Sequence, residues 1–304
     1  VARGKPATES STYTGSNSAP YITDGNLATF NHTALEANAW LEVDLGATYP
    51  VDNITLRNRS DCCSSRLRNF SVFVSEEPFA SKNYAATIAQ PNVFRYHFIT
   101  SAGAVVDFNI HRKARYVRVQ LNVTDYLHLR ELEVWTTGAD KKMNVAGGTK
   151  PSSSTSYDGT TSPLVGVDGA AHSPHGSGFS IFHTLTATNN QWFETDLTSI
   201  QQIESIDIVR RPDPFEALVD HYILISDVPF TSKDLATSLA QPGVSAYHFK
   251  GGTDKPVPIN RSGRYVRVQK SGAASANGYI GFAEIRIWPH AKLLGAMIKT
   301  VDPE

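Results

Sequence analysis

The sequence predicts an all-β protein made of two tandem antiparallel β-sandwich domains. Three observations lead to this fold class: a repeat that divides the chain, many short segments of strand-like composition, and no long segment with helical spacing. The chain has 304 residues, of which 40% are hydrophobic and 19% are charged. This composition is rich enough for packed cores, and the length matches about two domains of ordinary size.

The repeat is visible in several motifs. WLEVDL at Trp40 returns as WFETDL at Trp192, and RYVRVQ begins at both Arg115 and Arg264. Because the copies cover nearly the whole chain, we predict domains at residues 1–140 and 141–304. The boundary is expected in the polar stretch 137–142. The tail beyond Trp288 has apolar spacing for one or two helical turns.

Within the first copy, short segments rich in β-branched and aromatic residues alternate with Gly, Pro, Asn and Ser clusters. These segments are Trp40–Leu45, Asn53–Arg59, Phe70–Ser75, Phe94–Phe98, Val105–Ile110, Arg115–Leu121 and Glu131–Thr136. So many short strands in one copy favour an antiparallel sandwich with jelly-roll or Greek-key connections.

Charge and motif content exclude several function classes. The 28 Lys and Arg balance 29 Asp and Glu, so no overall field draws the protein to nucleic acid. The apolar stretch at 293–298 is far shorter than the roughly 20 residues that span a bilayer. No nucleophile elbow, zinc-protease motif, phosphate loop or dinucleotide fingerprint is present, which argues against an enzyme.

A dense polar cluster in the first copy predicts a binding site. His32, Arg59, Asp61 and Arg66 fall at loop positions, and Asp61 can orient one guanidinium. The remaining Arg donors suit the vicinal hydroxyls of a polyhydroxylated ligand, and His32 adds a donor or acceptor. The alternative is a solvated surface network of Arg and Asp.

Two adjacent cysteines, Cys62 and Cys63, lie inside this cluster. A disulfide between sequence neighbours strains the intervening peptide, so it is a poor device for stability. It would instead form a rigid, polarisable plate on a loop. The alternative is a pair of reduced thiols.

These residues resemble the fucose-recognition signature of the F-type lectins (fucolectins). The resemblance rests on the spacing His32-x26-Arg59-x-Asp61-x4-Arg66 and on the loop sequence NRSDCCSSRL. It implies a discoidin-like jelly roll that binds terminal α-L-fucose without catalysis. The resemblance also implies that His32, Arg59 and Arg66 hydrogen-bond the sugar and that Asp61 holds the arginines. A Cys62–Cys63 disulfide would stack on the sugar ring, and Phe30 would shelter its methyl group.

The same resemblance implies one structural calcium ion in each domain. In the first copy the implied ligands are the side chains of Asp24 and Glu131, with mainly backbone oxygens of Tyr21, Asn26, Thr29 and Arg130. In the second copy they are Asp168 and Glu284, with the carbonyls of Val165, Ala170 and Ala283. The alternative is that Asp24 belongs to a simple turn and Glu131 is a solvated carboxylate.

The second copy departs from the sugar signature. His183, Arg211 and Asp213 are retained, and Phe215 could replace the cysteine plate. The second arginine is missing. The second copy is therefore either a lectin domain of altered specificity or a structural copy.

The resemblance implies fucosylated glycans on cell surfaces as partners, a secreted or cell-surface location, and a homo-oligomer that would raise avidity. Two alternatives remain open. One is a discoidin-type adhesion module that binds phospholipid or protein, because one fold supports many functions. The other is a binding module from a larger glycan-active enzyme or toxin.

Overall fold

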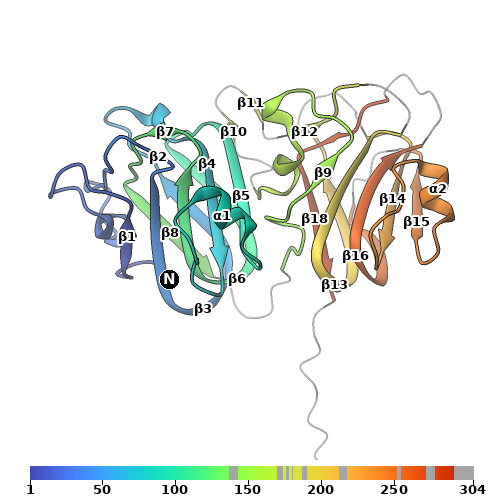
Figure 1. Ribbon diagram of the computed structural model, residues 1–304, viewed down its shortest axis with the longest axis horizontal. Helices are drawn as coiled ribbons and strands as arrows, with labels where there is room; N and C mark the ends of the chain where they lie inside the picture. Colours follow the sequence, from blue (N-terminus) through green and yellow to red (C-terminus); the bar gives the residue numbers. More distant parts are fainter. Residues whose placement is uncertain are drawn as a thin grey trace, which may run out of the picture.

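The computed structural model contains two six-stranded antiparallel sheets, one in each half of the chain (Figure 1). It describes residues 1–136, 143–169, 174–175, 178–179, 181–186, 190–211, 218–251, 255–271 and 278–290. The prediction of an all-β protein with two antiparallel sandwich domains is confirmed. The predicted boundary at 140/141 lies outside the described residues and stays a prediction. The helical turn expected in the tail beyond Trp288 also stays a prediction, because residues 291–304 of that tail lie outside the described residues.

The first sheet has the strand order β1-β3-β6-β4-β5, and β8 pairs with the C-terminal part of β3, from Val51 to Arg57. Its strands are β1 (Ala7–Glu9), β3 (Trp40–Arg57), β4 (Arg68–Ser75), β5 (Phe94–Ser101), β6 (Val105–Leu121) and β8 (Glu131–Thr136). A small separate pair consists of β2 (Glu36–Ala37) and β7 (Thr124–Asp125). Two 3-10 helices, η1 (Ala19–Thr23) and η2 (Ser64–Arg66), lie in the loops.

Two long strands turn the corner of the sandwich. The register between β3 and β6 shifts after Asp44 and resumes at Tyr49, where both strands bend (Figure 1). For each of these long strands, the sequence predicts two shorter strands, one before the bend and one after it: Trp40–Leu45 and Asn53–Arg59 in place of β3, and Val105–Ile110 and Arg115–Leu121 in place of β6. The structure joins them into single strands because the backbone pairing continues through the irregularity.

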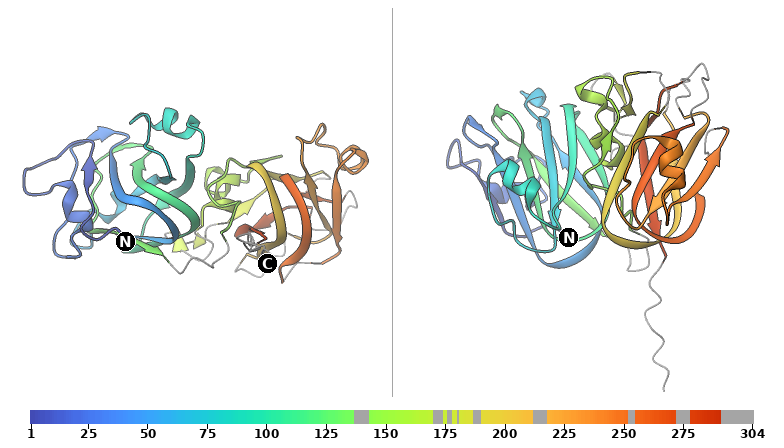
Figure 2. Two further views of the ribbon diagram at one scale, coloured as in Figure 1. Left: turned by 90° about the horizontal axis from the view of Figure 1, so that it is seen from below. Right: turned by 45° about the vertical axis from the view of Figure 1, so that its right-hand side comes forward.

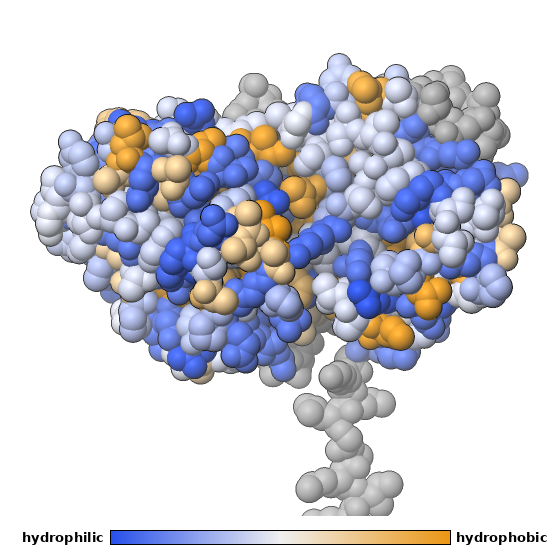
Figure 3. Space-filling model, viewed as in Figure 1, coloured by the Kyte–Doolittle hydropathy of each residue, from blue (hydrophilic) through white to orange (hydrophobic). Residues whose placement is uncertain are grey.

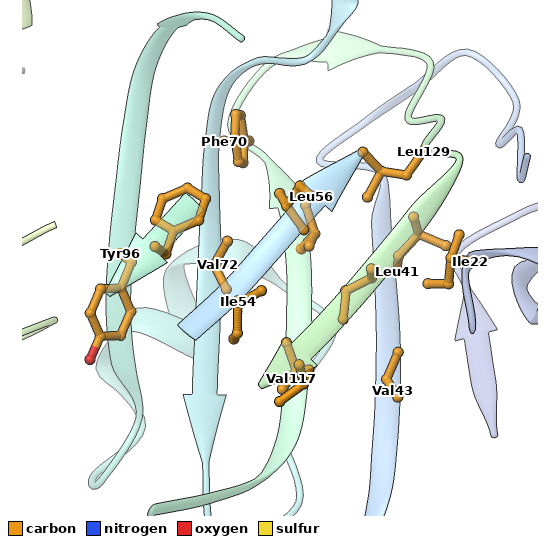
Figure 4. Close-up of a cluster of buried hydrophobic side chains, with 14 of the residues drawn as sticks. Ile22, Leu41, Val43, Ile54, Leu56, Phe70, Val72, Tyr96, Val117 and Leu129 are labelled. Atoms are coloured by element: carbon orange, nitrogen blue, oxygen red, sulfur yellow. The ribbon is translucent and has the colours of Figure 1, made fainter. Parts of the chain in front are cut away.

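The first core lies between the two layers that this bend creates. Figure 4 shows Leu41, Ile54, Leu56, Phe70 and Val117 pointing into it from β3, β4 and β6. All five are fully buried. Buried and half-buried residues alternate along the first part of β3 as predicted, whereas β4 is buried at every residue from Phe70 to Ser75.

The second domain repeats this arrangement with the order β15-β14-β16-β13-β18, and β9 pairs with β13. Its strands are β9 (Ser152–Ser153), β13 (Trp192–Val209), β14 (His221–Ser226), β15 (Ser245–Phe249), β16 (Val257–Lys270) and β18 (Glu284–Pro289). The short strands β12 (Phe182–His183) and β17 (Gly281–Phe282) pair with each other, as do β10 (Pro174–His175) and β11 (Gly178–Phe179). Two 3-10 helices, η3 (Gly159–Thr161) and η4 (Pro163–Val167), precede them. A separate hydrophobic cluster fills this domain.

The repeated RYVRVQ motif has a structural role. Arg118 and Arg267 are fully buried, and each forms an ion pair, with Glu42 at 2.7 Å and Glu194 at 2.6 Å respectively. Removing one partner of such a pair would leave a buried charge uncompensated, which explains why both copies carry the motif.

Each domain also contains one short helix that the sequence analysis misses, α1 (Tyr84–Ala89) and α2 (Leu235–Ala240). The signal for them was present: the side chains of Asn83 and Asp234 accept hydrogen bonds from Ala86 N and Thr237 N and cap the helix starts. At six residues each, these helices are too short to show a clear helical period.

The face of the molecule in Figure 3 is mostly hydrophilic, with hydrophobic residues in small separate patches. Within the described residues, no helix is long and apolar enough to cross a membrane.

Candidate functional site

One edge of the first domain brings together three segments that are far apart in sequence. The segment 31–33 pairs with 127–129, through Asn31 N to Leu129 O at 3.1 Å and Thr33 N to Leu127 O at 3.0 Å. This pairing places the rings of His32 and His128 side by side, with centroids 5.4 Å apart. The loop 58–66 supplies the arginines.

His32 is held in one tautomer. Its Nδ1 lies 2.8 Å from the carbonyl oxygen of Thr33. Because a carbonyl can only accept, Nδ1 carries the proton and Nε2 presents a lone pair. Burial lowers the pKa of His32, and the nearby Arg59 and Arg66 lower it further. His32 is therefore a neutral hydrogen-bond acceptor at physiological pH.

Arg59 is fixed by a carboxylate and a ring. Its Nε and Nη2 donate to Asp61 at 3.2 and 2.6 Å, and its guanidinium lies 4.0 Å from the centroid of Phe30. Asp61 also accepts from Arg130 at 2.9 Å. The bond from Arg59 holds the pKa of Asp61 well below its usual range. Phe30 thus supports Arg59, and its contact with a sugar methyl group stays a prediction.

Arg66 has different partners, which corrects one expectation. The resemblance implies that Asp61 holds both arginines, whereas the structure pairs Arg66 with Asp125 at 3.8 Å. Its guanidinium lies 4.5 Å from the centroid of Tyr126. The fold explains this difference. The end of β7 brings Asp125 to Arg66, whereas Asp61 pairs with Arg130.

The two cysteines are exposed free thiols in the structure, so the expected disulfide is not present in it. Cys63 has the left-handed backbone angle φ = 61°, just before η2 begins. A hydrogen bond with Cys63 raises the pKa of the Cys62 thiol, which favours the protonated thiol over the thiolate.

Three residues of this edge were missed from the sequence. Tyr13 and Tyr126 flank His32, with centroids at 4.9 and 5.1 Å, and His128 lies beneath it with 1% exposure. Burial lowers the pKa of His128 to about 4. The two tyrosines could have been found from the repeat, since they recur as Tyr157 and Tyr279.

In the first domain, Glu131, one of the two acidic residues assigned to calcium, lies next to the loop that carries the other, Asp24. Glu131 is 4% exposed and accepts from Gly25 N at 3.2 Å. Burial raises the pKa of Glu131 to about 7, and Asp24 adds to the increase. Asp24 itself accepts from Thr29 Oγ1 at 2.8 Å, and Thr29 Oγ1 also donates to Asn26 O.

The second domain has the same acidic pair, more deeply buried. Asp168 and Glu284 are 0% and 1% exposed, and Glu284 accepts from Gly169 N at 3.2 Å. Burial raises the pKa of Glu284, with Asp168 as the next cause. Ala170, a predicted carbonyl ligand, lies outside the described residues.

A buried glutamate with a neighbouring aspartate fits a hard cation in both domains, although the aspartate is exposed in the first domain (Asp24) and buried in the second (Asp168). Among the described residues, no group of three or more His, Cys, Asp or Glu side chains is arranged to hold a metal. A cation here would therefore need backbone oxygens. The candidates are the carbonyls predicted from the sequence: Tyr21, Asn26, Thr29 and Arg130 in the first domain, and Val165 and Ala283 in the second.

The corresponding edge of the second domain keeps the aromatic half of the site. His183 lies between Tyr157 and Tyr279, with ring centroids at 5.8 and 5.0 Å. Arg211 is partly buried just beyond β13. Asp213 and Phe215 lie outside the described residues, so their roles stay predictions.

The cationic half is reduced in the second domain. Leu218, one of two residues that align with the second arginine, is a core residue with 6% exposure. In the second domain His183 lies opposite Gly281 in the strand pair, whereas in the first domain His32 lies beside His128.

Part of the chain is similar to known proteins. Residues 21–119 match a family model described as a NedA-like, galactose-binding domain. The chain is similar to Fucolectin-6 of Anguilla japonica, 32% identical over 105 residues, which is 34% of this chain and 52% of the relative. It is also 32% identical over 125 residues to Fucolectin-5 of Anguilla japonica, covering 38% of this chain and 61% of the relative. The chain thus spans about half the length of the curated relatives it matches.

Among solved structures, the chain is similar to the lectin domain of lectinolysin complexed with Lewis B antigen. That domain is 35% identical, with 45% of this chain and 96% of that chain covered and a TM-score of 0.38. These proteins are named for binding carbohydrate and not for catalysis.

Proposed function

We propose that the chain is an F-type lectin (fucolectin) and that its first domain is a non-catalytic site for terminal α-L-fucose. The proposal rests on His32, Arg59 and Arg66, which converge on one partly open edge. A neutral imidazole acceptor beside two guanidinium forks matches neighbouring hydroxyls that donate one hydrogen bond and accept others.

The single observation that carries the proposal is the way each arginine is held. Arg59 is fixed between Asp61 and Phe30, and Arg66 between Asp125 and Tyr126. Each guanidinium is therefore oriented before a ligand arrives, which lowers the entropy cost of binding. A purely solvated network would not need a separate aromatic support for each arginine.

The cysteine pair has a proposed role as a stacking surface. Cys62 and Cys63 are exposed between the two arginines in sequence, next to η2. Oxidation would join the two sulfur atoms, with loss of two protons and two electrons to an external thiol oxidant. The product would be an apolar plate against which one face of a sugar ring can pack.

A calcium ion is the proposed structural cofactor of each domain. Asp24 and Glu131 would hold it in the first domain, and Asp168 and Glu284 in the second, together with backbone carbonyls. The ion would supply positive charge that offsets the repulsion between the buried glutamate and its neighbouring aspartate in each domain. Calcium should therefore raise the melting temperature of the chain. Glu131→Gln should reduce that increase and leave the cysteines and arginines of the proposed sugar site unchanged.

The proposed partners are fucosylated glycoconjugates, and the proposed location is secreted or at the cell surface, where such glycans are displayed. A single monosaccharide offers few contacts, so affinity per site should be modest, about −4 to −8 kcal/mol.

Isothermal titration with L-fucose, with D-galactose as the control sugar, tests this function. Saturable heat with L-fucose that disappears in Arg66→Ala supports the proposed site. Equal binding of both sugars would overturn the fucose assignment, and absence of heat with either would overturn the lectin function.

A further inference from the structure

The two domains are joined by a specific interface and not only by the linker. In the first domain, Arg112 donates to Val145 O and to Gly147 O, the latter at 2.8 Å. Asn109 donates to Gly169 O through both its backbone N and its Nδ2, each at 2.9 Å. These bonds connect β6 to two separate loops of the second domain, which fixes orientation as well as distance.

Glycines make this close approach sterically feasible. Gly148 has φ = 67°, and a Cβ placed there would lie 2.9 Å from Tyr96 and 3.0 Å from Arg95 N. The equivalent residue of the first domain, Gly4, has φ = 71° and no atom within 4 Å of such a Cβ. Both glycines make the same internal bond, to Val167 O and Thr23 O at 2.7 Å, so only Gly148 has the additional role at the interface.

The interface aligns the ligand-facing edges of the two domains. In Figure 1, β2 and β7 of the first domain and β12 of the second all lie at the upper edge of the molecule. The right-hand view of Figure 2, turned about the vertical axis, keeps both sets of loops at that edge. The bends of β3 and β13 lie at the opposite end.

The second edge keeps the geometry of a sugar-facing surface. Tyr157 N donates to His183 O at 2.9 Å, just as Tyr13 N donates to His32 O at 2.7 Å. Tyr157 and Tyr13 are both 59% exposed, so each presents a ring to solvent beside its histidine. Exposed aromatic rings with a polar neighbour suit the apolar face and the hydroxyls of a sugar.

We propose that the interface between β6 and residues 145–148 and 169 makes the chain a rigid bivalent unit that engages one surface through both domains. The partner that fits this arrangement is a surface densely covered with fucose-terminated glycans, with the second domain binding a sugar of the same coat. This inference rests on the proposed function of the first domain and extends it to the second.

The physical advantage lies in effective concentration. Once the first domain has bound, a fixed second site on the same side needs no search through linker conformations, so its binding becomes intramolecular. Two sites pointing in opposite directions could not both reach one flat surface.

The experiment measures binding of the full chain to surfaces coated with fucosylated neoglycoprotein at high and low density, together with titration by free L-fucose. Wild-type protein should bind the dense surface about 100-fold more tightly than the sparse one. His183→Ala should lose most of that advantage. Gly148→Ala should lose about tenfold on the dense surface, because it forces the domains apart, whereas the matched Gly4→Ala should retain it.

Each outcome is decisive. If free L-fucose binds but His183→Ala behaves like wild type on both surfaces, the second domain takes no part and the bivalent inference is overturned while the proposed function stands. If Gly148→Ala and Gly4→Ala bind the dense surface equally, the rigid alignment is overturned. If free L-fucose does not bind at all, the proposed function itself fails.

Discussion

The edge of the first domain that carries His32 and the edge of the second domain that carries His183 share an aromatic arrangement and differ in their charged residues. His32 and His183 occupy matching strands, and each lies between two tyrosines. In the first domain the edge also carries His128 and Arg130, whereas the second domain has Gly281 and the buried Ala283 at those positions. The difference shows that the fold preserves the aromatic support while the hydrogen-bonding groups change around it.

The sheets differ much less than the edges. The buried pairs Arg118–Glu42 and Arg267–Glu194 are equivalent, and so are the exposed forks Arg115–Asp44 and Arg264–Asp196. A rigid scaffold with variable loops allows one fold to serve two specificities.

The largest expected effect tests whether the scaffolds are equivalent. Arg118→Ala and Arg267→Ala should each destabilise their own domain by about 2–5 kcal/mol, because each removes a fully buried side chain together with its ion pair and leaves a cavity. Urea unfolding followed by tryptophan fluorescence measures this, since Trp40 and Trp192 lie 5.6 Å from the two guanidinium groups. Destabilisation in only one of the two domains would break the comparison of scaffolds.

Acid should affect the first domain more than the second. Burial lowers the pKa of His97 to about 3 and of His128 to about 4 in the first domain, and of His221 to about 4 in the second. An unfolded histidine takes up its proton near pH 6.5. For each histidine that stays neutral in the folded state, the free energy of unfolding of its domain therefore falls by up to about 3 kcal/mol as the pH falls from about 6.5 to about 4.

The raised pKa values of Glu131 and Glu284 oppose this loss in both domains, because protonation of these buried carboxyls stabilises the folded state. Domain-resolved unfolding at pH 7 and pH 4.5 measures the difference. His128→Ala should make the first domain less sensitive to acid. A second domain that unfolds first on acidification would contradict the account.

Arg66→Ala should remove about 1.5–3 kcal/mol of fucose binding, because it removes charge-assisted bonds that the second domain lacks. Arg68→Ala is the matched control, since Arg68 also pairs with Asp125, at 3.2 Å, from a half-exposed position. Titration with L-fucose measures both variants, and thermal unfolding checks the fold. Equal loss in the two variants would mean that general positive charge, and not the Arg66 fork, supports the sugar.

The smallest expected effect concerns the cysteines, which have no equivalent in the second domain. Cys62→Ser/Cys63→Ser should weaken fucose binding by about 1 kcal/mol relative to the oxidised protein, through loss of the sulfur plate. The melting temperature should change little, because both thiols are exposed and a link between neighbours adds little stability. Titration with and without reductant measures the effect. A change in melting temperature without a change in affinity would contradict the stacking role.

Local sequence patterns predicted the fold class well. Alternation along segments such as Trp40–Leu45 identified strands, and the repeat identified two domains. The continuity of β3 and β6 could not be predicted, because their bends look like turns in the sequence and only pairing with a distant strand carries them through.

The site was predictable only where its contacts are local. Arg59 and Asp61 are two residues apart, so their pair could be proposed from the sequence. The bond from Arg130 to Asp61 spans 69 residues, and Arg66 meets Asp125 only because β7 returns to this edge. Such long-range partners depend on the fold.

A crystal structure of the chain soaked with L-fucose tests the central claim most directly. The account predicts one sugar at the first edge, with hydroxyls at His32 Nε2 and at the guanidinium groups of Arg59 and Arg66. A sugar bound elsewhere on the first domain, or bound only at the second edge, would contradict it.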